Sequence, residues 1–163
     1  MKTLLLLRHG KSSRDDPLQP DHDRPLKKRG RNEVQTRGRW MLEQNLIPDL
    51  ILCSTSVRTM ETMHWLTGEW RITPERRIHQ ELYHADAKQI FRHVYHLPER
   101  FSVVLMVGHN PGFEQFVSLF SEKQEVLPTT SLALLEFDVC NWSELTEKSR
   151  LKTIAVFRHR ELS

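Results

Sequence analysis

A run of four leucines, residues 4–7, constrains this chain more than any other feature, because it ends abruptly in Arg8-His9-Gly10. Four consecutive apolar residues predict a short strand that is buried on both faces, as in the middle of a parallel sheet. In open α/β sheets, ligands bind at the carboxyl ends of such strands. The pattern therefore predicts that Arg8 and His9 lie at a ligand site, and that Gly10 lets the backbone turn and approach the ligand closely.

The rest of the chain alternates between strand-like and helix-like segments. Apolar runs predict strands at residues 48–53, 77–79, 102–107, 130–139 and 151–157. Helices are expected over residues 27–44, 54–66, 86–96 and 111–120. This alternation predicts an α/β fold, a three-layer α/β/α sandwich with a mainly parallel central sheet. A length of 163 residues suits one domain spanning residues 1–163.

Local signals predict where the helices begin and which faces they bury. Ser54 is the expected N-cap of the second helix, and Asn110 with Pro111 the expected N-cap and first residue of the fourth. Side-chain spacing in the first helix predicts one inward face and one solvated face. The inward face holds Gly30, Val34, Gly38, Met41 and Leu42, and the solvated face holds Lys27, Lys28, Arg31, Arg37 and Arg39.

Three of the predicted strands end in residues that bind anions. The first ends in Arg8 and His9, the second in Ser54 with Arg58 about one helical turn later, and the fourth in His109. Because parallel strands point the same way, these residues are expected to meet at one edge of the sheet. Helix N-termini attract phosphate, and arginine binds phosphate oxygens through a bidentate fork. The sequence therefore predicts a phosphate site with two imidazoles and two guanidinium groups.

With these motifs in this order, the chain resembles the histidine phosphatase superfamily, which has a phosphoglycerate mutase-like fold. Within that superfamily it is most similar to the small SixA-type phosphohistidine phosphatases. The matching pieces are Arg8-His9-Gly10, Arg24-Pro25-Leu26 with Gly30, Ser54 with Arg58 and Thr62, Glu81-Leu82-Tyr83, Gly108-His109-Asn110-Pro111-Gly112 and Thr129-Thr130-Ser131.

The resemblance implies a catalytic role for each matched residue. His9 would attack phosphorus and carry the phosphoryl group as a covalent phosphohistidine, which water would then hydrolyse. Arg8, Arg58 and His109 would hold the phosphoryl oxygens and stabilise charge in the transition state. No cofactor and no metal is expected. A neutral imidazole is needed for the attack, and an unperturbed histidine pKa of about 6.5 allows this at neutral pH.

Two further residues are candidates for the site. Ser12, in the loop after the Arg8-His9-Gly10 motif, could donate a hydrogen bond to phosphate. Glu81 lies in the region where larger members of the superfamily carry an acidic proton donor. Phosphate esters leave as alkoxides and need such a donor, whereas a phosphoramidate leaves as imidazole and needs it less.

The chain lacks the long insertions that cover the pocket in the sugar-phosphate enzymes of the superfamily. An open site favours a phosphorylated protein side chain, so the expected activity is removal of the phosphoryl group from a phosphohistidine of a phosphorelay or carrier protein, such as a histidine phosphotransfer-type domain. Two alternatives stay open. The chain could be a small-molecule phosphomonoesterase or mutase on the same fold, or an inactive module that binds phosphorylated partners.

Composition and spacing argue against other classes of protein. Only four residues separate Cys53 from Arg58, whereas the phosphate loop of a cysteine phosphatase needs five. The basic residues lack the interleaved aromatic residues or the motif of a nucleic-acid-binding protein. No run of about 18 apolar residues indicates a membrane span, and two cysteines make no disulfide framework. We therefore expect a cytoplasmic monomer without nucleic-acid or membrane partners.

Overall fold

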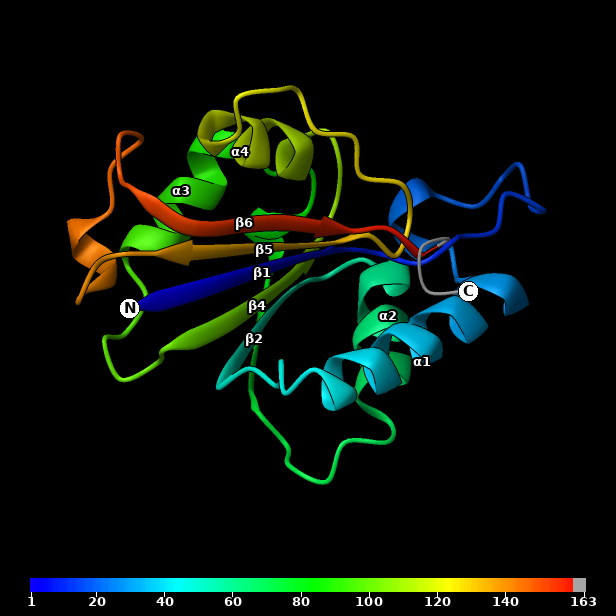
Figure 1. Cartoon of the computed structure of the whole chain (residues 1–163). Coiled ribbons are helices and arrows are strands. Elements are labelled where there is room, and N and C mark those ends of the chain that lie inside the picture. The colour runs from blue at the N-terminus through cyan, green and yellow to red at the C-terminus, as the bar shows by residue number, and fades with distance from the viewer. Residues whose placement is uncertain (160–163) are drawn as a thin grey trace.

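A six-stranded sheet forms the middle layer of the protein, and helices cover both of its faces (Figure 1). The computed structural model describes residues 1–159. The strands are β1 (Lys2–Arg8), β2 (Leu50–Ser54), β3 (Glu75–His79), β4 (Val103–Gly108), β5 (Leu132–Phe137) and β6 (Leu151–Phe157). The helices are α1 (Lys28–Glu43), α2 (Val57–Thr67), α3 (Ala87–Tyr95) and α4 (Gly112–Phe120), with 3-10 turns η1 (Asp21–Asp23), η2 (Gln80–Leu82) and η3 (Trp142–Glu144).

The sheet is mainly parallel, as the sequence predicts. Its strand order is β3-β2-β4-β1-β5-β6. Strands β3, β2, β4 and β1 run parallel to one another, and β5 pairs in the antiparallel sense with both β1 and β6. The carboxyl ends of the four parallel strands therefore meet at one edge, where ligands bind in open α/β sheets.

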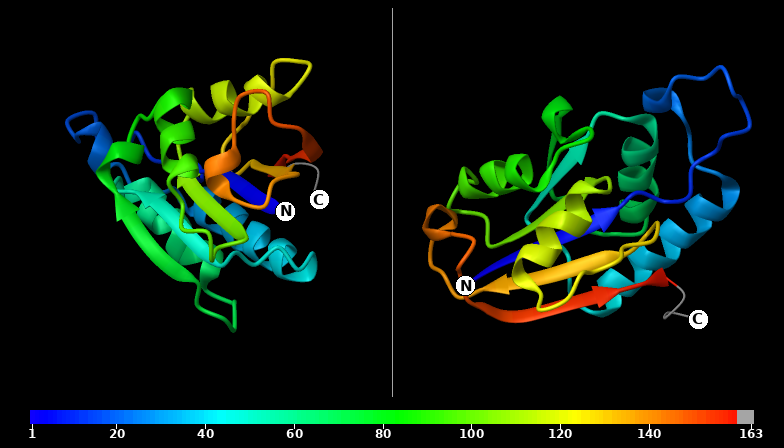
Figure 2. Two further views of the ribbon diagram at one scale, coloured as in Figure 1. Left: turned by 90° about the vertical axis from the view of Figure 1, so that its left-hand side faces the viewer. Right: turned by 90° about the horizontal axis from the view of Figure 1, so that it is seen from above.

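The leucine run in β1 forms part of the core on both sides of the sheet. Leu4 and Leu6 belong to the apolar cluster that includes residues of α3 and α4. Leu5 and Leu7 belong to the cluster that includes residues of α1 and α2. All four side chains are fully buried. This alternation follows the two-residue period of a strand, and Figure 2 shows the sheet between the two pairs of helices.

Two predicted helix starts are wrong. Ser54 is the last residue of β2, and the hydroxyl of Ser56 caps α2 by accepting a hydrogen bond from the backbone N–H of Thr59. Helix α4 begins at Gly112, with Pro111 as its N-cap residue. Asn110 does not cap that helix, because its side-chain amide donates to the Leu127 carbonyl and to Glu114.

The predicted faces of α1 are correct except at two positions. Arg37, expected in solvent, is fully buried and donates hydrogen bonds to the carbonyl oxygens of Thr130 and Phe157. Its guanidinium also lies 5.0 Å from the ring of Trp40. Leu42, expected inside, is 41% exposed. The buried face of the helix thus includes Arg37, whose carbonyl partners flank β5 and end β6, and leaves out Leu42.

The segment between β5 and β6, which reads as a polar connection, contains a core residue. Trp142 is fully buried, and its indole N–H donates to the Phe101 carbonyl. The ammonium group of Lys2 lies 5.6 Å from its ring. Among residues 1–159, no helix has the combined length and apolar character that crossing a membrane requires.

Candidate active site

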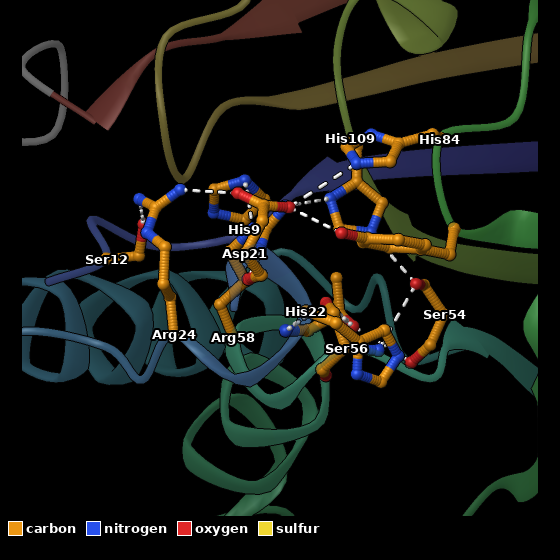
Figure 3. Close-up of polar contacts among 12 residues, drawn as sticks. His9, Ser12, Asp21, His22, Arg24, Ser54, Ser56, Arg58, His84 and His109 are labelled. Carbon is orange, nitrogen blue, oxygen red and sulfur yellow. Dashed lines mark hydrogen bonds and ion pairs between the residues drawn. The ribbon is translucent and has the colours of Figure 1, made fainter. Parts of the chain in front are cut away.

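The residues predicted to bind phosphate meet at one cavity of about 230 Å³ at the carboxyl edge of the sheet. Figure 3 shows His9, Arg58 and His109 converging there from β1, α2 and β4. The predicted convergence is therefore confirmed. A larger cavity of about 830 Å³ lies beside β6 and has no histidine in its lining. The smaller cavity is lined by Arg8, His9, Lys11, Ser12, Arg14, Asp21, Arg24, Arg58, His84, His109, Asn110 and Thr129.

His9 is held in the tautomer that a nucleophile requires. Its Nδ1 lies 2.8 Å from the Gly10 carbonyl oxygen, which can only accept, so Nδ1 carries the proton. The lone pair of Nε2 accordingly faces the site, where the Nε of Arg58 donates to it at 3.3 Å. Burial, and next the charges of Arg58, Arg8 and Arg24, lower the pKa of His9 to about 3, despite the Gly10 hydrogen bond. The ring is therefore neutral at physiological pH.

Close packing, rather than a left-handed backbone, explains the glycine at position 10. No glycine among residues 1–159 has a positive φ, so the turn at Gly10 does not need glycine's conformational freedom. A side chain there would instead come within 2.8 Å of Val34 and 3.0 Å of the Gly30 carbonyl. Glycine is required because the segment directly after β1 packs closely on α1, while the Gly10 N–H donates to the Thr62 hydroxyl.

His109 lies beside His9, with the two ring centroids 5.4 Å apart. Its Nδ1 lies 3.4 Å from Nη2 of Arg58, which can only donate. The other ring nitrogen, Nε2, therefore carries the proton and donates to Ser54 Oγ at 2.9 Å. Burial, and next the electrostatic effects of His9 and Arg58, lower the pKa of His109 to about 2. Both imidazoles are thus neutral in the free protein.

Arg58 is buried at the centre of the site and is fixed by Asp21. Its Nη1 donates to the Asp21 carbonyl at 2.7 Å, and its Nη2 pairs with the Asp21 carboxylate at 3.0 Å. The same carboxylate accepts hydrogen bonds from Arg24 and from the Tyr83 hydroxyl. Burial raises the pKa of Asp21, but the hydrogen bonds from Tyr83, Arg24 and Arg58 outweigh it and hold the pKa well below its usual range.

Arg8 and Ser12 also line the cavity, as predicted. Arg8 donates through Nη1 to the Leu127 carbonyl, while its buried Nε has no hydrogen-bond partner among residues 1–159. A buried donor without a protein partner is rare, so Nε is available to a bound anion. The hydroxyl of Ser12 accepts a hydrogen bond from Arg24 at 2.5 Å and keeps its own proton to donate.

The structure does not bring Glu81 to the site. Glu81 lies in η2 with a side chain 69% exposed, and its carboxylate is 4.0 Å from His79. It lines a different cavity, together with His93 and Arg92. The 3-10 turn points Glu81 outward and Leu82 into the core. Nothing in this placement supports the predicted role as proton donor.

Four residues around the central side chains of the site were not predicted from the sequence to bind a ligand. Only two of them carried a usable signal. Arg24 belongs to the Arg24-Pro25-Leu26 motif, and Tyr83 directly follows Glu81-Leu82. The other two lie in loops, and their positions depend on tertiary contacts. The four residues are Asp21, Arg24, Tyr83 and His84.

Metal and thiol chemistry find no support at this site. No group of three His, Cys, Asp or Glu side chains that could hold a metal occurs within the described part of the chain. Cys53 is fully buried, and burial raises the pKa of its thiol to about 12. A thiol in that state is not a nucleophile at neutral pH.

Comparison with known proteins identifies the family. The model of the histidine phosphatase superfamily (branch 1) matches residues 4–88, which include the His9 motif, Arg58 and Ser54. The chain belongs to this superfamily. An uncharacterized chloroplastic protein of Arabidopsis thaliana is 31% identical over 152 residues, which are 88% of this chain and 70% of that protein. An uncharacterized protein of Mycobacterium tuberculosis is 33% identical over 105 residues, 64% of this chain and 63% of that protein.

Solved structures place this histidine phosphatase among SixA-type folds. The proposed phosphohistidine phosphatase SixA of Nakamurella multipartitia superposes with a TM-score of 0.80 and 25% identity, covering 94% of this chain and 95% of that one. A protein histidine phosphatase SixA complexed with tungstate has a TM-score of 0.83 at 19% identity, with 99% of both chains covered. Family and fold together support a phosphatase or mutase activity.

Proposed function

We propose that this histidine phosphatase hydrolyses phosphohistidine on a protein, through a covalent phosphohistidine intermediate on His9. The observation that carries the proposal is the unprotonated Nε2 of His9, which faces a cavity lined by guanidinium groups of Arg8, Arg24 and Arg58. An imidazole lone pair next to cations suits attack on an anionic phosphorus centre. The tungstate held by a SixA protein with the same fold is an oxyanion of similar shape, which supports the proposal.

The roles follow from the groups that each residue offers. Nε2 of His9 attacks phosphorus, and the bond from phosphorus to the leaving group breaks. Arg58 Nε and Arg8 Nε donate to phosphoryl oxygens, which carry the developing charge. His109 presents Nδ1 toward Arg58, so it joins the oxygens as a donor after taking up a proton when the anion binds. A water molecule then hydrolyses the N–P bond and releases phosphate.

The size of the cavity favours a protein side chain as the substrate. Sites that enclose small molecules have volumes of about 300–1,000 Å³, whereas this cavity measures about 230 Å³. It can take a phosphoryl group while the rest of the substrate stays outside. We therefore propose a phosphorylated protein, such as a histidine phosphotransfer-type domain, as the partner. Cytoplasmic location and a monomeric state also remain predictions.

Phosphate release from a phosphohistidine peptide tests the proposal. The wild type is expected to release phosphate, and His9→Asn is expected to be inactive. His96→Asn is the matched control, because His96 is an exposed histidine at the end of α3. A phosphodonor should also leave an acid-labile, base-stable label on the wild type and none on His9→Asn. Turnover of a sugar phosphate or phosphoglycerate without release from the peptide would overturn the proposal in favour of a small-molecule enzyme.

A further inference from the structure

His84 lies on the rim of the active-site cavity in an unusual backbone conformation. It is one of three non-glycine residues among residues 1–159 with a positive φ, at 55°. Such a conformation disfavours a residue with a Cβ and is found at functional sites more often than elsewhere. The side chain of His84 is 55% exposed and lines the same cavity as His9 and His109.

The contacts of His84 join it to the site. Its Nε2 lies 3.4 Å from the Asp21 carboxylate. Its ring centroid is 4.0 Å from that of Tyr83 and 5.6 Å from that of His109. Figure 3 shows the Asp21 carboxylate between Arg58 and His84. An imidazole and a carboxylate in this arrangement form a pair in which the carboxylate orients the ring.

The backbone beside His84 is held by close packing. A side chain at Gly112 would come within 1.9 Å of the Ala85 carbonyl oxygen, so the first turn of α4 rests directly on this segment. Asp86, the next residue along, caps α3 by accepting from the N–H of Gln89, and the Gln89 side chain accepts from the Asp86 N–H. The rim that carries His84 is therefore fixed to two helices.

Among the described residues, His84 is the one histidine lining the cavity that is not buried. His9 and His109 have lowered pKa values, and Glu81 lies elsewhere. The carboxylate of Asp21 stays ionised, because hydrogen bonds from Tyr83, Arg24 and Arg58 outweigh the effect of burial on its pKa. Burial, and next the Asp21 hydrogen bond, raise the pKa of Tyr83. Histidine is the side chain that ordinarily changes charge between pH 5 and 8.

We propose that His84 is the catalytic proton donor to the leaving group, and that Asp21 is its positioning residue. The proposal rests on the proposed function. As Nε2 of His9 forms its bond to phosphorus, the imidazolium of His84 gives a proton to the departing nitrogen or oxygen. Neutral His84 then takes a proton from the attacking water, whose oxygen bonds to phosphorus while the bond to His9 breaks. Phosphate is released, and protonated His84 and neutral His9 are restored.

The role of His84 as proton donor can be tested with two substrates whose leaving groups differ in their need for a proton. The substrates are phenyl phosphate and p-nitrophenyl phosphate, and the readout is kcat/KM, which reports the step up to phosphoryl transfer to His9. The variant is His84→Asn, because asparagine tolerates the left-handed backbone better than most other non-glycine residues. General acid catalysis contributes about 10²–10⁴-fold. We expect kcat/KM to fall by about 10²-fold or more for phenyl phosphate and by less than about threefold for p-nitrophenyl phosphate.

Asp21 needs a readout that separates its effect on His84 from its contact with Arg58. Loss of the Arg58 contact would lower kcat/KM for both substrates equally. Loss of His84 positioning lowers it selectively for phenyl phosphate. We expect Asp21→Asn to show the selective fall, and Asp21→Glu to restore part of the activity. His64→Asn, an exposed histidine of α2, is the control.

The outcomes of the experiment separate the two proposals. If the wild type depends on His9 but His84→Asn loses activity equally for both substrates, or for neither, the role of His84 is overturned and the proposed function stands. If the wild type hydrolyses neither aryl phosphate nor the phosphohistidine peptide, the proposed function is overturned, and the role of His84 with it.

Discussion

The two buried histidines should make the folded protein lose stability as the pH falls from 7 to 5. His9 and His109 are 7% and 4% exposed, and their pKa values are lowered to about 3 and about 2, chiefly by burial. In the unfolded chain each would titrate near its usual pKa of about 6.5. Below that pH the unfolded state binds protons that the folded state does not, so unfolding becomes easier. The loss begins near pH 6.5 and continues down to the folded pKa values.

The size of the effect follows from these values. Each unit of pH between the unfolded and the folded pKa costs about 1.4 kcal/mol per group. Between pH 7 and pH 5 each histidine therefore removes about 2 kcal/mol, and the pair removes up to about 4 kcal/mol. His93, whose pKa is also lowered by burial, acts in the same direction. A comparison with variants that lack His9 and His109 isolates their share.

Urea unfolding at pH 7 and pH 5 measures the effect. The wild type should lose more free energy of unfolding between the two pH values than the double variant His9→Gln with His109→Gln. Any constant cost of the substitutions cancels, because only the difference between pH values is compared. Inorganic phosphate should reduce the loss in the wild type, since a bound anion stabilises protonated imidazoles. Equal losses in both proteins would refute the conclusion that these rings are buried in the neutral form.

Three further predictions concern the scaffold. Arg37→Met should lower the free energy of unfolding by about 1–3 kcal/mol, because two carbonyl oxygens lose a buried donor. The control Arg39→Met, at an exposed position, should change it by less than about 0.5 kcal/mol. Similar urea midpoints for the two variants would contradict this prediction. Gly38→Ala should lower the thermal midpoint, because the new Cβ would lie 2.1 Å from the Leu66 carbonyl oxygen. This cost should exceed the gain in helix propensity of up to about 1 kcal/mol. The control Gly68→Ala, whose Cβ would have no contact closer than 3.7 Å, should not lower the midpoint. Iodoacetamide should label the exposed Cys140 and leave Cys53 unlabelled in the folded protein, with phosphatase activity retained. Labelling of Cys53, detected by mass spectrometry, would show that the core around Cys53 is more open than the structure indicates.

The sequence alone determines the architecture and the central four residues of the site. The apolar runs are long and evenly spaced enough to identify the strands, and a parallel sheet necessarily gathers the carboxyl ends of its strands at one edge. Arg8, His9, Arg58 and His109 could be brought together on that argument, and the structure places them around one cavity. Short-range patterns suffice here, because strand direction converts positions in the sequence into positions in space.

Only the tertiary structure decides which loop residues join these four. Asp21 and His84 come from two loops whose positions follow from packing, such as the contact between Gly112 and Ala85, and no periodicity reports such contacts. The burial of Arg37 has the same cause, since its partners are carbonyl groups more than 90 residues away. Local propensity acts over a few residues, whereas the charge state and orientation of a side chain depend on everything that surrounds it in the folded protein.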